Sequence, residues 1–441
     1  MNEAQKRSKH GAKENADLLI VNANELVTVE GGSQKPRTGA QMREVGIIRD
    51  GSLAAKEGKI VAVGKTSEVT KVFKAENMIN ANGKTVLPGF VDAHTHLIFA
   101  GSREEEFQMR VEGASYMEIL GAGGGILRTV RETRKASVEK LADLAIERLD
   151  VMLEHGTTTV EAKSGYGLTT KDELKILEVV RRANQMHAMD VVPTFLGAHA
   201  IPPEYQGSPL GYVGLVVDEM IPKVAEKGLA EFCDVFCEKG VFGLEQTRRI
   251  LSAGKSYGLK PKVHADEMSQ LGGAELAADF GAVSADHLLF SSDEGLRAMA
   301  DKGVVAVLLP AAAFSLMNGR FADARVMINF GVPVALGTDY NPSCMVESMQ
   351  LVITFACHFM RLKPAEAITA TTINAAHALG RASDFGSLEV GKCADVVVLD
   401  APNHKFLGYH FGVNLVDKVV KKGRIVVDKE ANPSEIVHLE E

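Results

Sequence analysis

The chain contains 441 residues, of which 46% are apolar and 24% charged, and it carries a formal net charge of -8. Such a length can form a complete barrel together with a smaller domain. The acidic balance gives no electrostatic reason to expect binding to nucleic acid or to an anionic membrane, so an anionic substrate needs a local positive group.

The N-terminal segment, residues 1–17, is polar and of mixed charge, without the apolar core of a secretory signal. We therefore expect residues 1–15 to form a disordered extension. The five cysteines are odd in number and scattered, which favours a reduced, cytoplasmic protein over a disulfide scaffold. Cys233 and Cys237 share a face of one predicted strand, where buried packing explains them better than a second metal site.

Short β segments separated by turns dominate both ends of the chain. They begin at Asp17, Glu25, Val45, Ser52, Lys59 and Lys84 on the N-terminal side, and at Ala394 and Val416 on the C-terminal side. The termini of compact domains often lie close together. We therefore predict one small β-sandwich-like domain built from residues 16–87 and 386–441.

Residues 88–385 alternate apolar strands with helical patterns, which is typical of an α/β protein with a parallel sheet. An apolar stripe over residues 138–152 has the period of a helix that covers such a sheet. The predicted strands are residues 89–98, 157–162, 190–196, 232–236, 260–264, 282–287, 304–309 and 332–337. Eight strands of this kind predict a closed (β/α)₈ TIM barrel, inserted between the two parts of the β domain.

Two histidines spaced one residue apart, His94 and His96, follow an apolar run that begins at Pro88. Residues i and i+2 of a strand point to the same face, so the two imidazoles are predicted to converge on one point. His264 and Asp339 also stand at the ends of apolar runs. Three imidazoles and one carboxylate suit zinc or iron, and a catalytic site adds a water.

Each of these pieces also has an ordinary explanation, because polar residues at strand ends often only make hydrogen bonds. The joint pattern favours an active site, since polar side chains gather where the predicted strands end, at the face where β/α barrels carry catalytic residues. These side chains are His94, His96, Glu161, His199, Glu238, His264, Glu267, His287 and Asp339.

Several longer motifs resemble the amidohydrolase superfamily, and most closely its ring-opening hydrolases of histidine degradation. The motifs are residues 91–104 (VDAHTHLIFAGSRE), 157–168 (TTTVEAKSGYGL), 194–204 (TFLGAHAIPPE), 264–267 (HADE) and 337–342 (GTDYNP). The resemblance covers nearly all of the chain after the polar N-terminal segment. It implies a homodimer and a small-molecule substrate, 4-imidazolone-5-propanoate.

The resemblance also implies roles for individual residues. One divalent ion per subunit, zinc or iron, would be held by His94, His96, His264 and Asp339. The substrate pocket would be lined by Arg103, Tyr116, Tyr166, His199, Glu267, Asn341, Ser343 and Cys344. Cys344 stands where the family's loop usually carries a small Gly or Ser.

Within that resemblance, water activated by the metal attacks the cyclic amide. Glu267, or Asp339 acting from the metal shell, is expected to take the water proton and pass it to the departing ring nitrogen. His287 is expected to stabilise the developing oxyanion, and the planar guanidinium of Arg103 to bind the carboxylate tail. The predicted catalytic residues are thus Glu267, His287 and Asp339.

Two other functions remain open at this point, namely deamination of a heterocycle by a similar one-metal site and a non-catalytic barrel scaffold. All four ligand positions are filled, which argues against the scaffold. Lys163 is predicted to pair with Glu161 rather than to be a carbamylated metal ligand. The glycine run that begins at Gly121 does not follow a strand with phosphate-loop spacing, so it predicts a lid or a tight turn.

Overall fold

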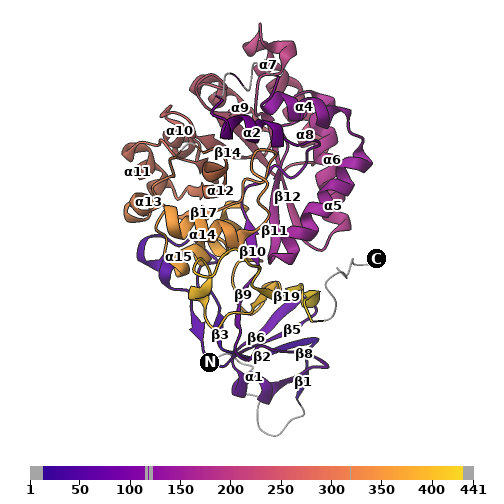
Figure 1. Ribbon diagram of the computed structural model, residues 1–441, viewed down its shortest axis with the longest axis vertical. Coiled ribbons are helices and arrows are strands. Elements are labelled where there is room, and N and C mark those ends of the chain that lie inside the picture. The colour runs from indigo at the N-terminus through magenta and orange to yellow at the C-terminus, as the bar shows by residue number, and fades with distance from the viewer. Residues whose placement is uncertain (1–12, 115–117, 119–122, 318, 431–441) are drawn as a thin grey trace.

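The computed structural model describes residues 13–114, 118, 123–317 and 319–430. Its centre is an eight-stranded parallel sheet in which the strands follow one another in chain order (Figure 1). The strands are β10 (Phe90–Asp92), β11 (Thr157–Lys163), β12 (Asp190–Ala198), β13 (Phe232–Cys237), β14 (Lys260–Ala265), β15 (Ser284–His287), β16 (Val305–Leu308) and β17 (Val334–Leu336). Each predicted barrel strand is therefore present, and the predicted (β/α)₈ barrel is confirmed.

The first barrel strand is shorter than predicted, because β10 ends at Asp92, before both histidines of the HxH motif. Backbone hydrogen bonds nevertheless hold that motif between the neighbouring strands. His96 N donates to Tyr340 O (2.9 Å), Asp339 N donates to His94 O (3.0 Å), and Lys163 N donates to Thr95 O (2.9 Å). The segment that carries the histidines thus continues the first strand in irregular form and closes the barrel against the segment after β17.

Helices cover the outside of the barrel because each presents an apolar stripe to the sheet. In α5 (Val138–Glu154), for example, Leu141, Ala145 and Leu149 are fully buried, as the stripe over residues 138–152 predicts. The other helices of this layer are α6 (Thr170–Met186), α7 (Pro209–Leu215), α8 (Ile221–Glu226), α9 (Leu244–Ser256), α10 (Gly273–Phe280), α11 (Asp293–Lys302), α13 (Ala324–Phe330), α14 (Met349–Phe359), α15 (Pro364–Ala370) and α16 (Ile373–Ala378).

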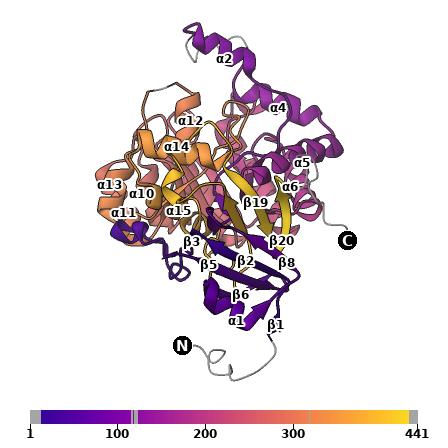
Figure 2. The same ribbon diagram turned by 60° about the horizontal axis from the view of Figure 1, so that its bottom comes forward.

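Three further helices lie where barrel strands end. They are α2 (Glu104–Val111), α4 (Ile126–Lys135) and α12 (Pro310–Ser315). In the turned view, α2 and α4 project from the end of the barrel that is remote from the β sheets (Figure 2). No helix among the residues of known placement is long and apolar enough to cross a membrane.

Strands from both ends of the chain share one β-rich region at the bottom of Figure 1. A six-stranded sheet has the order β20-β19-β18-β9-β3-β4, and a four-stranded sheet has the order β6-β5-β2-β8. The members are β2 (Leu18–Ala23), β3 (Glu25–Val27), β4 (Ile47–Ile48), β5 (Gly51–Lys56), β6 (Lys59–Lys65), β8 (Asn77–Asn80), β9 (Thr85–Pro88), β18 (Val396–Leu399), β19 (Val416–Lys421) and β20 (Arg424–Asp428). A β domain made from both termini is therefore present.

A small pair of strands extends this region at its N-terminal end. Strand β1 (Glu14–Asn15) pairs in parallel with β7 (Phe73–Lys74), and α1 (Thr66–Val72) precedes β7. The sequence predicted disorder for residues 1–15, so that prediction is wrong at Glu14 and Asn15, whose backbone is hydrogen-bonded. Residues 1–12 lie outside the described residues.

The β region packs against the N-terminal ends of the barrel strands. Strand β9 leads directly into β10, and the Lys421 ammonium of β19 contacts Asp190 at the start of β12 (2.5 Å) and Asp395 (2.5 Å). The C-terminal ends of the barrel strands consequently face away from the β sheets. Those ends carry the polar residues singled out from the sequence.

Candidate metal centre and active site

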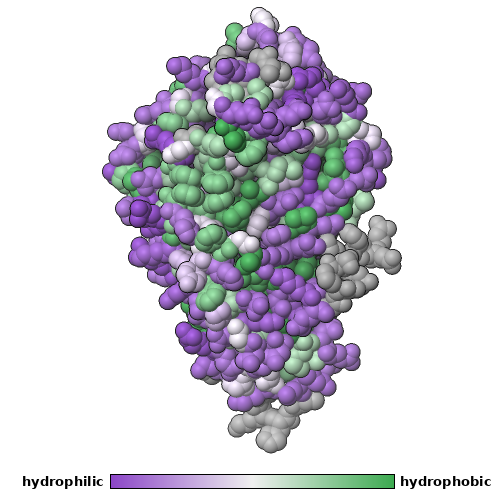
Figure 3. All heavy atoms as spheres, viewed as in Figure 1, coloured by the Kyte–Doolittle hydropathy of each residue, from purple (hydrophilic) through white to green (hydrophobic). Residues whose placement is uncertain are grey.

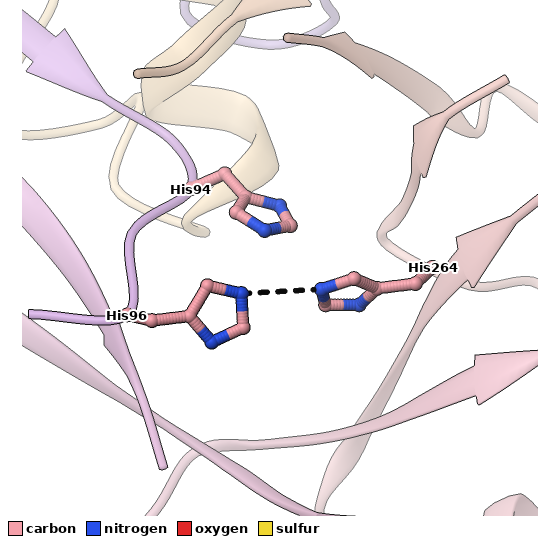
Figure 4. A group of neighbouring side chains, drawn as sticks. All are labelled: His94, His96 and His264. Atoms are coloured by element: carbon pink, nitrogen blue, oxygen red, sulfur yellow. Dashed lines mark hydrogen bonds between the residues drawn. The ribbon is translucent and has the colours of Figure 1, made fainter. Parts of the chain in front are cut away.

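Four side chains converge at the C-terminal end of the barrel. His94 and His96 follow β10, His264 lies in β14, and Asp339 follows β17. Oδ1 of Asp339 lies 3.5 Å from Nε2 of His94 and 3.5 Å from Nε2 of His96. Figure 4 shows the three imidazoles pointing toward one another, with the Nε2 atoms of His96 and His264 3.5 Å apart. All four side chains are buried.

These spacings fit a single divalent metal ion. Donor atoms placed ~2.0–2.1 Å from a tetrahedral ion lie ~3.4 Å from one another. Nε2 of His94 and Oδ1 of Asp339 are buried without a hydrogen-bond partner among the described residues, although buried polar atoms are usually paired. A donor set of imidazoles and one carboxylate suits a transition metal, so the residues present fit a metal cofactor.

Buried carboxylates contact the far side of two of these imidazoles. Nδ1–H of His94 donates to Oδ2 of Asp286 (2.6 Å), and Nδ1 of His264 lies 3.0 Å from Oδ2 of Asp234. The ring of His96 is instead stacked on that of His199, with centroids 4.7 Å apart and planes 10° apart. Such outer partners fix the tautomer and orientation of a ligating imidazole.

The protonation of these groups follows from burial. Desolvation, with Lys163 as the next largest cause, lowers the pKa of His94 and of His264 well below the usual value, so both rings are neutral. Burial likewise raises the pKa of Asp339 to about 7 in the metal-free chain. A bound cation would favour the Asp339 carboxylate, since a nearby positive charge stabilises the anionic form.

A cavity of about 930 Å³ opens beside the four donors. This volume lies in the range of small-molecule sites, roughly 300–1,000 Å³. The predicted substrate-binding residues that line the cavity are Arg103, Tyr166, His199, Glu267, Asn341, Ser343 and Cys344. Tyr116, and Gly121 at the start of the glycine run, lie outside the described residues. The structure thus brings the described candidate substrate-binding residues, which are far apart in the sequence, to one cavity.

Arg103 stands immediately before α2, at the rim of this cavity. Its Nη1 donates to Ser343 Oγ (2.7 Å) and its Nε donates to Thr129 Oγ1 (3.0 Å). Both of these partners are neutral hydroxyls, so they orient the guanidinium without cancelling its charge. The arrangement offers a fixed cation to an anionic group in the cavity.

Tyr166 and His199 also line the cavity, and a buried carboxylate that was not predicted as a site residue fixes the segment around Tyr166. Glu173 of α6 accepts the backbone N–H groups of Gly165 (3.0 Å), Gly167 (2.8 Å) and Leu168 (2.7 Å). The carbonyl of Gly165 in turn accepts Nδ1–H of His199 (3.1 Å). Burial lowers the pKa of His199 to about 4, so the ring is neutral and its Nε2 is a hydrogen-bond acceptor.

Glu267 and His287 lie next to each other in the lining of the cavity, with Glu267 Oε1 3.6 Å from His287 Nδ1. The loop that carries Glu267 is held by Asp266, whose carboxylate accepts four backbone N–H groups at the start of α10 and the hydroxyl of Ser291. Asp266, His287 and Asp339 all have positive φ values, of 49°, 73° and 51°. Side chains seldom tolerate this conformation, and its concentration at one site is typical of functional positions.

The segment after Asp339 forms a tight turn against the cavity. Asn341 and Cys344 exchange backbone hydrogen bonds (3.1 and 2.9 Å), and the Asn341 side chain donates to the carbonyl of Asp339 (2.7 Å). Cys344 is buried, which raises the pKa of its thiol to about 12. The thiol is therefore neutral, and its S–H donates to Thr338 O (3.6 Å).

Several buried charged residues beneath the donors were not predicted as site residues. Lys163, expected to pair with Glu161, does so (2.9 Å), but it also contacts Asp234 (2.7 Å) and Asp286 (3.2 Å). A second lysine, Lys262, contacts Glu161 (2.6 Å). In the sequence, such residues can be recognised as lysines and acidic residues that stand within otherwise apolar barrel strands.

A metal-dependent barrel hydrolase is the class that this fold and site define. Residues 85–426 match the model of the amidohydrolase family, and the chain belongs to that family. Among solved structures the chain is similar to an adenosine deaminase from Xanthomonas campestris with bound Zn (TM-score 0.72, 21% identity, 97% of this chain and 96% of that one). A 5-methylcytosine deaminase from Klebsiella pneumoniae is also similar (TM-score 0.70, 16% identity, 96% and 100%). At these identities the likeness concerns the fold.

Much closer relatives carry the name imidazolonepropionase. The chain is 54% identical to the imidazolonepropionase of Alkaliphilus metalliredigens over 416 residues, which is 94% of this chain and 98% of the relative. It is also 54% identical to the imidazolonepropionase of Geobacillus kaustophilus, over 93% of this chain and 98% of the relative.

Proposed function

We propose that the chain hydrolyses 4-imidazolone-5-propanoate to N-formimidoyl-L-glutamate, as an imidazolonepropionase of histidine degradation. The observation that carries this proposal is the 54% identity to imidazolonepropionases over nearly the whole chain. The cavity is compatible with the substrate, a small cyclic amide with a carboxylate tail, because it combines neutral rings with the fixed guanidinium of Arg103.

One divalent ion, zinc or iron, is proposed to be held by His94, His96, His264 and Asp339. The support is the 3.5 Å spacing of their donor atoms and the unpaired Nε2 and Oδ1 atoms. When bound, such an ion lowers the pKa of water toward ~7 and so makes a nucleophile available at neutral pH. The rest of the chemistry is assigned to side chains.

Substrate orientation is assigned to the two walls of the cavity. Arg103 offers its charge to the carboxylate tail, while the Tyr166 hydroxyl, buried beside it, is a further donor. Neutral His199 offers Nε2 as an acceptor to a ring N–H. Asn341, Ser343 and Cys344 line the edge of the cavity and limit its shape on that side. Together these contacts place the cyclic carbonyl near the four donors.

Proton transfer is assigned to Glu267, with Asp339 as the alternative base. Glu267 takes a proton from the attacking water, whose oxygen bonds to the carbonyl carbon, and the proton then passes to the ring nitrogen as the C–N bond breaks. His287, held 3.6 Å from Glu267, donates to the oxyanion that forms at the carbonyl oxygen. The product leaves with a new carboxylate and an open chain.

A substrate panel tests the proposal against the rival class of heterocycle deaminases. Purified protein is assayed with 4-imidazolone-5-propanoate, by loss of imidazolone absorbance, and with guanine and cytosine, by release of ammonia. The proposal predicts turnover of the imidazolone alone. Turnover of guanine or cytosine without turnover of the imidazolone would assign the site to a deaminase instead.

A homodimer is proposed as the assembly, through an apolar face formed by α12, α14 and residues 406–413. Phe314 stacks on Phe355 (4.7 Å), Phe321 stacks on Phe359 (4.5 Å), and Phe411 lies against His358. Phe314, Phe359 and Phe411 are exposed, and apolar residues gather over this face in Figure 3. Soluble monomers seldom expose large apolar patches.

Sedimentation of the wild type and of Phe359→Asp tests the proposed homodimer. A dimer is expected for the wild type and monomers are expected for the variant.

Two further proposals concern the organisation and location of the chain. We propose residues 88–385 as the catalytic barrel domain and residues 16–87 with 386–441 as the β domain, since the strands of each belong to separate sheets. A cytoplasmic location is proposed because all five cysteines carry free thiols. Fractionation of cells that express the full chain tests the location.

A further inference from the structure

A buried ammonium group lies directly beneath the four metal-donor side chains. Lys163 of β11 is completely buried, and its Nζ contacts Asp234 Oδ2 (2.7 Å), Glu161 Oε2 (2.9 Å) and Asp286 Oδ2 (3.2 Å). Although burial disfavours the charged form, these three carboxylates together raise the pKa of Lys163. The lysine is therefore a fixed cation in the barrel interior.

Two of its carboxylate partners are the ones that contact metal-donor imidazoles. Oδ2 of Asp286, which touches Lys163, accepts Nδ1–H of His94 at 2.6 Å. Oδ2 of Asp234, which also touches Lys163, lies 3.0 Å from Nδ1 of His264. A single ammonium thus joins two carboxylate–imidazole pairs that reach the same site from β13, β14, β15 and the segment after β10.

We propose that Lys163 is a positioning residue that holds Asp234 and Asp286 against His264 and His94, and thereby directs both Nε2 lone pairs at the metal. The inference rests on the metal centre proposed above and does not depend on which substrate is turned over. Lys163 is not one of the four donor residues, and its ammonium acts on them only through the two carboxylates. Its expected effect is therefore on metal affinity.

The physical reason is repulsion between buried anions. Oxygen atoms of Asp234 and Asp286 lie within 4.8 Å of each other in the protein interior, where like charges interact strongly. The ammonium between them compensates both charges. Without it, the two carboxylates repel each other and separate, and an imidazole then loses the acceptor that fixes its Nδ1–H tautomer. The same ammonium fills the space among three carboxylates in which a second cation could bind.

The other buried lysine of the network offers a matched control. Lys262 lies on β14, three strands from Lys163, contacts Glu161 (2.6 Å) and lies over the ring of Phe232 (5.0 Å). Among the described residues, its ammonium forms an ion pair with Glu161 and none with Asp234 or Asp286. Replacing Lys262 therefore removes an equally buried positive charge while leaving the link to the imidazoles in place.

The test measures Zn²⁺ affinity, by competition with a fluorescent chelator, for full-length wild type, K163M and K262M stripped of metal. Loss of an outer partner typically weakens metal binding by about 10- to 100-fold, so K163M is expected to bind Zn²⁺ at least about tenfold more weakly. K262M is expected to stay within about threefold of the wild type. Circular dichroism checks that each protein is folded.

A charge-balanced variant, E161Q/K163M, covers the case in which K163M does not fold. It removes one charge of each sign, so the barrel interior is less perturbed, and the same tenfold loss of affinity is expected. In parallel, long-range ¹H–¹⁵N NMR of ¹⁵N-histidine-labelled apo wild type should show Nδ1–H tautomers for His94 and His264. An Nε2–H tautomer at either ring contradicts the proposal without any variant.

The outcomes distinguish a wrong metal centre from a wrong role for Lys163. If the wild type binds no Zn²⁺, the metal centre itself is wrong and Lys163 has nothing to position. If the wild type binds Zn²⁺ and K163M or E161Q/K163M binds it equally well, the role of Lys163 alone is wrong. Equal losses in K163M and K262M would mean that only the interior charge matters, which also overturns the proposal.

Discussion

Replacing Arg103 by methionine tests how the cavity holds an anionic tail. The guanidinium makes its two described hydrogen bonds with neutral hydroxyls of Ser343 and Thr129, so its charge is available to a ligand. A hydrogen bond to a charged group contributes about 1.5–3 kcal/mol. Since 1.4 kcal/mol corresponds to a tenfold change in binding, Arg103→Met should raise KM by roughly 10- to 100-fold.

The assay is loss of imidazolone absorbance under initial-rate conditions, with bound metal measured on the same samples. Metal content should not change, because Arg103 is not among the clustered donor residues. Arg128→Met is the matched control, since Arg128 pairs with Glu105 (2.8 Å) near the same helices but does not line the cavity. Its KM should stay within about twofold. A KM for Arg103→Met equal to that of the wild type would refute the assignment of the anchor.

Three further changes test other walls of the site. Glu267→Gln should lower kcat by ~10²-fold or more with metal content unchanged, since a positioned base is typically worth ~10²–10⁴-fold, and full activity would shift the role to another group. Glu173→Gln should lower the free energy of unfolding in urea by about 1–3 kcal/mol and raise KM, because the loop of Tyr166 loses its buried charged acceptor. Glu178→Gln, a control at a half-exposed position of the same helix, should do neither. The pKa of His199 is about 4 in the folded protein and ~6.5 in the unfolded chain. Between these pH values the unfolded chain binds a proton that the folded protein does not bind. The free energy of unfolding of the metal-free protein should therefore fall by about 3 kcal/mol as the pH falls from 6.5 to 4. The free energy of unfolding of His199→Gln, measured by urea titration, should fall by correspondingly less over that pH range. If the variant showed the same pH dependence as the wild type, the His199 ring would not be buried and neutral.

The barrel and the donor set could be predicted from the sequence because both have local signals. Each barrel strand is an apolar run with a polar residue at its end, and the ligand-type residues stand at those ends. The prediction erred on why His94 and His96 converge, since β10 ends at Asp92. Hydrogen bonds from the neighbouring segments, rather than regular strand geometry, place the two rings. Those bonds depend on barrel closure, which no local pattern encodes.

The groups that position the site were the part that the sequence did not reveal. Asp234, Asp286 and Lys163 lie on different strands, and their contacts depend on the stagger of those strands around the barrel. Glu173 is four residues into the sequence that forms α6, where an acidic residue is ordinary. Only its burial against three backbone N–H groups shows that it fixes the loop of Tyr166.

The most direct test of the account is to titrate metal back into metal-stripped protein while following loss of the imidazolone ring. The stripped protein should show no turnover, and activity should recover fully at one equivalent of Zn²⁺ or Fe²⁺ per chain. Turnover that survives complete removal of metal, or recovery that needs two equivalents, would contradict a single-ion centre built from three imidazoles and one carboxylate.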